Sequence, residues 1–290
     1  NIGFFYNGRI PTRENPKAAR KVVQGISSSA IWPLNRPIEK LPTFINPPNG
    51  WIQSTNQNPY AVMGKYSMAL DPKNPNVYFE QRLTNRSFVA NELLSTPVKI
   101  TLDDFIDIKF DHSYSENSRQ FKYLMKLAEN NPEIAEKVRP CDRQTNFKNK
   151  HAGYNSCLMA HEWLSEMNAQ PIPKTEDVLS KCQNWFTEIN REQTDEWEKI
   201  TTITRLGRSY PIQGSVDTLR AVYGTPNAET NSIDMSGGDG LFYIIEESLD
   251  GRMIYGMHNF GSSRNTESVH YSDQTFLFSK EALRFIPDNL

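Results

Sequence analysis

The sequence predicts an α+β fold in which antiparallel strands from both ends of the chain flank a helical middle. Short β-type runs bounded by turn-forming residues occupy 1–84, helical spacing dominates 85–206, and strand patterns return in 207–290. An order of strands, then helices, then strands favours α+β topology, with a sheet built from distant parts of the chain. We therefore expect one discontinuous domain made of three sequential segments.

The first segment, 1–84, is rich in Pro, Asn and Gly. It contains two short runs of β-type residues, 2–6 and 51–55, each bounded by turn formers. We expect a strand at each run and irregular loops around them.

The second segment, 85–206, is expected to be mostly helical. Thr101 followed three residues later by Asp104 is a helix-start pattern. Two apolar stripes with the helical period follow, and both are expected to face a core. The first stripe consists of Tyr154, Cys157, Leu158, His161 and Leu164, and the second of Leu179, Cys182, Trp185, Phe186 and Ile189.

The third segment, 207–290, contains the clearest hairpin of the chain. Strand patterns at 240–246 and 252–258 are separated by Asp250-Gly251, a pair that supplies the two positive-φ positions of a tight turn. We therefore expect a type I′ hairpin centred on Asp250 and Gly251.

Composition and charge exclude two classes of function. The chain of 290 residues has 32 Lys and Arg against 34 Asp and Glu, so its net charge of -2 offers no field for a nucleic-acid backbone. The longest apolar run, 241–245, is far shorter than the ~18 residues of a membrane span. Asn1 comes first and the first methionine is Met63, so we expect the chain to begin inside a longer gene product.

The three cysteines are Cys141, Cys157 and Cys182, and their spacings fit neither a zinc site nor a disulfide framework. Three cysteines allow at most one disulfide bridge. The cysteine content therefore does not indicate whether the compartment is oxidising or reducing. Each cysteine lies on or beside a helical apolar face or next to Pro140, so buried structural thiols are favoured over a nucleophile.

Two patterns imitate known motifs but lack their defining residues. His161-Glu162 would need a second histidine where Ser165 stands, so a core histidine with satisfied hydrogen bonds is favoured over a metalloprotease site. The glycine-rich run 237–240 opens a strand and not a helix, so a turn is favoured over a phosphate loop.

A set of polar residues near the carboxyl end could be imagined as a hydrolytic triad. Its members are His258, Ser262, Ser263, His270 and Asp273. Because the sequence has no Gly-x-Ser-x-Gly elbow and a triad is defined by geometry, this interpretation has no support beyond composition.

Residues 46–59, NPPNGWIQSTNQNP, are the most unusual stretch. They place a short strand between two turns, with Asn56 just past the strand end and Pro59 ending any continuation. One interpretation is a cluster of Asx turns, in which asparagine side chains bond their own backbone. The other is a carboxamide that is held rigidly and points at a reacting oxygen. The residues alone favour the Asx turns.

This stretch resembles the penicillin acylase family of N-terminal-nucleophile (Ntn) hydrolases, whose large subunit carries Asn-Pro, a Gly-aromatic strand and an Asn-rich turn before Pro. Further segments agree with the family in order along the chain: NIGFFY at 1–6 with IPTR at 10–13, PIQGS at 211–215 with DTLRA at 217–221, and FGSS at 260–263 with HYSDQ at 270–274. The segment 211–221 is similar to the acyl-homoserine-lactone and lipopeptide acylase branch.

The resemblance implies amide hydrolysis by a serine at the amino terminus of the large subunit, with its own α-amino group as base. By family analogy that serine would lie ~180 residues upstream, so the chain is expected to be the later part of the large subunit and inactive alone. The implied fold is part of an αββα sandwich. The implied partners are the upstream part of the same precursor and a small-molecule acyl amide, and the implied location is periplasmic or secreted.

Two residues match family positions with a role in catalysis. Asn56 matches the asparagine whose amide donates to the oxyanion. Arg86 matches the arginine that holds this asparagine and the amino-terminal group in place, with Arg82, one helical turn away, as the alternative. His270 and Asp273 also match family positions, and their expected role is a structural cap or turn.

No cofactor or metal is expected within the chain, and calcium, seen in some relatives, would be held largely by residues outside it. Two functions from different classes stay open. The favoured one is an acylase acting on a penicillin, acyl-homoserine lactone or lipopeptide. The other is a catalytically silent binding or scaffold relative, in which Asn56 and Arg86 survive as structural residues.

Overall fold

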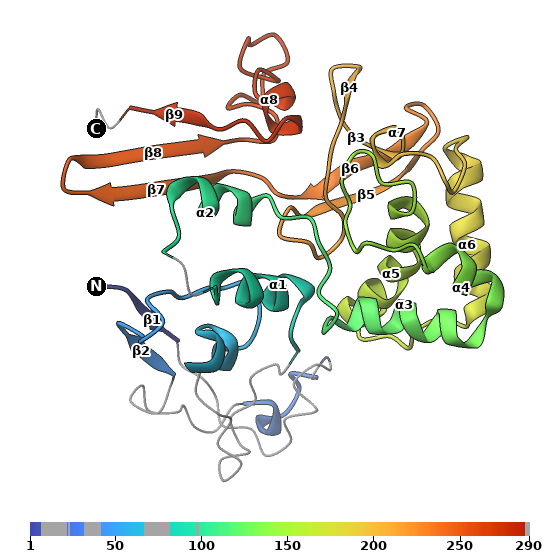
Figure 1. Cartoon of the computed structure of the whole chain (residues 1–290), viewed down its shortest axis with the longest axis horizontal. Helices are drawn as coiled ribbons and strands as arrows, with labels where there is room; N and C mark the ends of the chain where they lie inside the picture. The colour runs from blue at the N-terminus through green and yellow to red at the C-terminus, as the bar shows by residue number, and fades with distance from the viewer. Residues whose placement is uncertain (7–21, 23, 32–41, 67–81, 97–98, 288–290) are drawn as a thin grey trace. The chain divides into compact units, whose positions relative to one another are not determined.

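A computed structural model of the chain describes residues 1–6, 22, 24–31, 42–66, 82–96 and 99–287 (Figure 1). The chain forms two compact units, Asn1–Pro97 and Val98–Leu290. The IPTR segment at 10–13, part of the resemblance, lies outside the described residues.

The first unit contains a short antiparallel ribbon. Strand β1 (Gly3–Phe5) pairs with β2 (Thr43–Ile45), which confirms the strand predicted at 2–6. A small apolar cluster of Phe44, Val62 and Met63 lies beneath it. The other elements in the described part of this unit are three 3-10 turns and one helix: η2 (Ser28–Ala30), η4 (Pro59–Ala61), η5 (Gly64–Tyr66) and α1 (Asn85–Leu94).

The strand predicted at 51–55 is not formed in the described part of the chain. This segment has no regular secondary structure, and one backbone hydrogen bond joins it to the rest of the described unit, from Gln53 N to Val62 O at 2.9 Å. A strand needs a partner that continues the ladder of hydrogen bonds. The 3-10 turn that begins at Pro59 bends the chain away before a ladder can continue.

The second unit begins with the predicted helical region. Thr101 caps α2 (Leu102–Lys109), and Thr101 and Asp104 form a capping box, as predicted. The helices that follow are α3 (Arg119–Asn130), α4 (Pro132–Val138), α5 (Ala152–Met167), α6 (Thr175–Glu188) and α7 (Trp197–Ile200).

The two predicted apolar stripes lie on α5 and α6 and enter one core cluster. Cys157 and Cys182 form a disulfide between these helices, which settles the single bridge that the cysteine count allowed. The prediction is wrong for one member of the first stripe, because Leu164 is 40% exposed and does not face the core. It is in the last turn of α5 and does not belong to this core cluster.

Strands return after α7 in two sheets. A four-stranded sheet has the order β4-β3-β6-β5, in which β3 and β6 are parallel and the other pairs antiparallel. Its strands are β3 (Thr201–Arg205), β4 (Arg208–Pro211), β5 (Val222–Asn227) and β6 (Ser232–Gly238). An antiparallel sheet has the order β7-β8-β9, with β7 (Phe242–Ser248), β8 (Gly251–Met257) and β9 (Arg284–Ile286), and α8 (Thr275–Ser279) precedes β9 (Figure 1).

The predicted hairpin is confirmed, but its turn differs from the prediction. Ser248 pairs with Gly251, so the loop residues are Leu249 and Asp250. Neither has a positive φ, whereas Gly251 has a φ of 123°. A two-residue loop followed by glycine at the fourth position is typical of a type I turn and not of type I′.

Strands at both ends and helices in the middle confirm the α+β class. The division at residues 84 and 206, and the αββα sandwich that the resemblance implies, stay predictions. Within the described ranges, no helix has both the length and the apolar character that crossing a bilayer requires.

Candidate active site

The predicted oxyanion residue, Asn56, lies at the tip of a loop in the first unit. Its backbone is in the left-handed region with a φ of 64°, and its side chain is exposed. Asparagine tolerates this region better than most residues, and a non-glycine residue held there costs about 1 kcal/mol or more. Surrounding contacts must therefore hold the loop in this shape.

Helix α1 supplies those contacts. The hydroxyl of its N-cap residue Thr84 donates to the backbone oxygen of Thr55 at 3.3 Å. About two turns further along this helix, Asn91 Oδ1 accepts from Gln53 Nε2 at 3.3 Å. Both contacts precede Asn56 in the chain, so the helix fixes the segment that leads into Asn56.

Arg86, the second residue of α1, holds the Asn56 side chain itself. Its Nη2 donates to Asn56 Oδ1 at 3.1 Å. The carboxamide oxygen is therefore occupied, while the Asn56 Nδ2 has no partner among the described residues. The alternative, Arg82, precedes the helix and has no such bond to Asn56. The structure thus brings together Asn56 and Arg86, the two predicted site residues.

The neighbouring polar residues have a different task. Asn58 Oδ1 accepts from Tyr60 N at 2.9 Å and caps η4, so Asn58 is the Asx-type residue of this loop. Gln57 Oε1 accepts from the backbone and hydroxyl of Thr55, and its Nε2 donates to Gln53 O at 3.1 Å. These bonds shape the loop from within and leave the Asn56 amide group out of the local network.

The chain matches the family model for penicillin amidase over residues 1–287. The chain belongs to the penicillin amidase family. This match confirms the resemblance and supports an acylase or amidohydrolase function in general.

In this member of the amidase family, the segment 211–221 contains a buried arginine, Arg220. Arg220 has no exposed surface, its Nη2 donates to Phe278 O at 2.7 Å, and its Nη1 lies 3.2 Å from Asp239 Oδ2. A Cβ on Gly214, whose φ is 95°, would lie 2.1 Å from Arg220 O, so glycine is required at that position. Through these buried contacts, the segment helps to hold distant parts of the second unit together.

Two more charged groups complete this cluster. Lys109 Nζ lies 2.7 Å from Asp239 Oδ2, and Glu281 Oε1 lies 3.4 Å from Arg220 Nε. Burial lowers the pKa of Lys109 and raises the pKa of Glu281, in each case against the attraction of the opposite charge. Sequence reasoning missed this cluster, because its members lie far apart in the chain.

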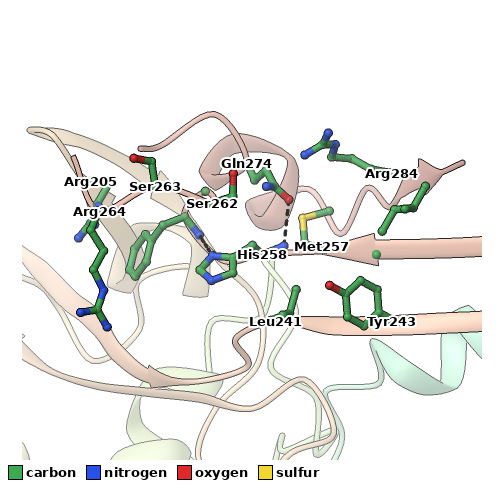
Figure 2. Close-up of a pocket in the computed structure, with 14 residues that line it drawn as sticks. Arg205, Leu241, Tyr243, Met257, His258, Ser262, Ser263, Arg264, Gln274 and Arg284 are labelled. Carbon is green, nitrogen blue, oxygen red and sulfur yellow. Dashed lines mark hydrogen bonds between the residues drawn. The ribbon is translucent and has the colours of Figure 1, made fainter. Parts of the chain in front are cut away.

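The imagined triad near the carboxyl end does not assemble. His258 Nδ1 accepts from Phe260 N at 3.2 Å (Figure 2), and His270 Nδ1 lies 2.9 Å from Asp273 Oδ2. Among the described residues, no hydrogen bond joins the hydroxyl of Ser262 or Ser263 to either imidazole. The His270–Asp273 pair lies in a turn, whose backbone accepts from Ser263 N.

One cluster has the composition of a metal site. Cys157, His161 and Cys182 place their ligand atoms within 4.8 Å of one another, all buried. Both thiols are consumed by the disulfide, so the cluster offers a single free ligand, the imidazole. The expectation that metals are absent from this chain stays a prediction.

Proposed function

We propose that the chain supplies the oxyanion-stabilising part of an N-terminal-nucleophile acylase, with Asn56 as the donor and Arg86 as its positioning residue. The observation that supports this proposal is the bond from Arg86 Nη2 to Asn56 Oδ1, which leaves the amide N–H of Asn56 unpaired. A residue kept only for an Asx turn would use its oxygen on the backbone, as Asn58 does.

The charge of Arg86 improves Asn56 as a donor. A guanidinium that binds the amide oxygen draws electron density from the carboxamide, which makes its N–H a stronger hydrogen-bond donor. The oxyanion of the tetrahedral intermediate carries more charge than the substrate carbonyl, so this donor stabilises the transition state more than the ground state. The site needs no cofactor for this task.

The remaining parts of the mechanism are proposed to lie outside the chain. The nucleophile is a serine at the amino terminus of the large subunit, released by processing of a precursor, and its α-amino group is the base. The substrate is a small-molecule acyl amide, in the range from penicillins through acyl-homoserine lactones to lipopeptides. The Cys157–Cys182 disulfide supports a periplasmic or secreted location, because such bonds persist in oxidising compartments.

The decisive experiment is Asn56→Ala in the full-length, processed protein, assayed with a chromogenic acyl amide. We expect kcat to fall by ~10²- to 10³-fold while KM changes little, since one transition-state donor is lost. The denaturation midpoint should fall only slightly: Asn58 and Gln57 still hold the loop around this exposed side chain, but alanine tolerates the positive φ of this position less well than asparagine.

Asn58→Ala is the matched control, because it removes an asparagine amide from the same loop. It should lower stability by about 1 kcal/mol, the usual cost of a lost cap, and leave turnover per folded molecule unchanged. A loss in kcat below about threefold for Asn56→Ala would defeat the oxyanion assignment. Absence of hydrolysis by the wild-type processed protein would instead favour the catalytically silent relative.

A further inference from the structure

The β7-β8-β9 sheet and the loop that follows β8 border a cavity of about 700 Å³ in the second unit (Figure 2). Side chains from all three strands line it, among them Tyr243 of β7, Met257 of β8 and Ile286 of β9. The sequence did not single out this cavity, because its walls come from segments about 80 residues apart.

The charge of this cavity has one sign. Arg205, Arg264 and Arg284 line it, and among its described lining residues there is no Asp or Glu. Within the described part of the chain none of these arginines forms an ion pair with a carboxylate. A cleft lined by charges of one sign concentrates the opposite charge, so the cavity attracts anions.

Arg205, at the end of β3, is oriented by two aromatic rings and keeps donors available for a ligand. Its Cζ lies 4.5 Å from the ring centroid of Phe260 and 3.9 Å from that of Tyr271. The aromatic contacts orient the guanidinium without using its N–H donors. Its Nε is buried and has no hydrogen-bond partner among the described residues. A buried charged donor without an acceptor is costly, and a bound anion would supply the acceptor.

The other polar groups of the cavity also offer donors. His258 Nδ1 accepts from Phe260 N, so in the neutral ring the proton is on Nε2, which can donate. Gln274 Oε1 accepts from His258 N at 3.0 Å, which leaves its amide N–H free (Figure 2). Ser263 Oγ accepts from Asn265 N, so its hydroxyl hydrogen is available. A set of donors without carboxylates fits an anionic acceptor and rejects a cation.

The rest of the lining is apolar. Leu241 is 57% exposed and Tyr243 is 55% exposed, large fractions for side chains of this size beside a cavity. Ile286 extends the same surface, whereas Met257 is only 2% exposed and contributes little of it. In Figure 2, Arg205 and Arg264 lie on one side of His258, and Tyr243, Met257 and Arg284 lie on the other. The cavity thus has two arginines at one end, and apolar side chains together with Arg284 at the other.

We propose that this cavity binds a carboxylate that carries an apolar chain. The carboxylate accepts from Arg205, Arg264 and His258, and the chain lies along Tyr243 and Ile286. Guanidinium groups pair with carboxylates through two parallel hydrogen bonds, and burial of the chain adds affinity for each methylene. Binding at this cavity requires no turnover and does not rest on the proposed function.

Calorimetric titration of the full-length, processed protein with decanoate tests this proposal. We expect saturable binding of one decanoate at the cavity, and affinity that rises by up to about fourfold for each methylene from hexanoate to decanoate. Decanol, which lacks the charge, and acetate, which lacks the chain, should each bind at least roughly tenfold more weakly.

Arg205→Gln and Arg264→Gln should each weaken decanoate binding by roughly tenfold, because a charge-assisted hydrogen bond is lost. Arg139→Gln is the matched control, because Arg139 is an exposed arginine at the C-cap of α4 that does not line the cavity. It should change the affinity by less than twofold. If Arg205→Gln lowers the melting temperature, the exposed Arg264→Gln alone decides. Equal affinity for decanol and decanoate, equal effects of Arg264→Gln and Arg139→Gln, or no saturable binding would overturn the proposal.

Discussion

At His161, the predicted burial is observed but the predicted hydrogen bonding is not. The sequence predicted a core histidine with satisfied hydrogen bonds, and the residue is 7% exposed on the α5 stripe. Its ring centroid lies 6.0 Å from that of Trp185. Yet its Nε2 has no hydrogen-bond partner in the described part of the chain, so the satisfied half of the prediction is wrong. Burial, with the nearby charge of Lys181, lowers the pKa of His161.

This depressed pKa makes stability depend on pH. Between the ordinary histidine pKa of about 6.5 and the lower pKa in the folded state, the unfolded chain binds a proton that the folded chain does not. Stability should therefore fall as the pH is lowered through this interval. We expect His161→Phe to lose less stability than the wild type between pH 7 and pH 5, measured by urea unfolding. Equal losses in the two proteins would contradict the role of His161.

At the scale of the element, the hairpin shows what a turn sequence can and cannot specify. The alternation of residues predicted two strands and a tight connection, and both are present. The register differs by about two residues, because Ser248 pairs with Gly251 and moves the turn to Leu249 and Asp250. Gly251 then begins β8 with a φ of 123°. The glycine is needed, but for the strand start and not as a central turn residue.

Gly251→Val should therefore destabilise the second unit by about 1 to 3 kcal/mol, since a β-branched residue is strained at this φ. A Cβ at this position meets no atom within 4 Å, so the cost is backbone strain without a clash. Gly240→Ala is the matched control, because Gly240 has no positive φ and the space beside it is also open. Its effect should stay within ~0.5 kcal/mol in the same denaturant titration. Equal midpoints for Gly251→Val and the wild type would disprove the strain.

At the scale of the whole molecule, the second unit is held by one long-range covalent link. The Cys157–Cys182 disulfide joins α5 to α6 across a sequence separation of 25 and lies in the centre of the helical core cluster. Cys141 is the free cysteine, partly buried, and burial raises the pKa of its thiol. That pKa makes it a poor nucleophile, as the sequence indicated.

Loss of the disulfide should lower the free energy of unfolding of this unit by about 3 kcal/mol, the loop-closure entropy of a link of this length. The variant Cys157→Ala/Cys182→Ala tests it by thermal unfolding, with Cys141→Ala as the control that keeps the bridge. A dithiol reductant should lower the melting temperature of the wild type and of Cys141→Ala, and leave the double variant unchanged. A reductant-insensitive wild type would show that the bridge does not form.

The sequence by itself determined the order of the elements and the residues of the candidate site. Thr101 and Asp104 predicted a capping box, and the helical period on α5 and α6 predicted their shared core, because these patterns depend on neighbours within one or two turns. The family resemblance pointed to Asn56 and Arg86, and the family match agrees with the resemblance along the chain. Their catalytic roles stay predictions.

Tertiary structure alone decided which of these features meet. It joined Arg86 to Asn56 across 30 positions, gave the Asx role to Asn58, and placed Leu164 outside the core. It also left 51–55 without a ladder and gathered the three arginines of the cavity from separate segments. The physical reason is the same in each case. Periodicity and turn chemistry report local conformation, whereas hydrogen-bond partners, burial and charge neighbours depend on segments that chain folding brings together.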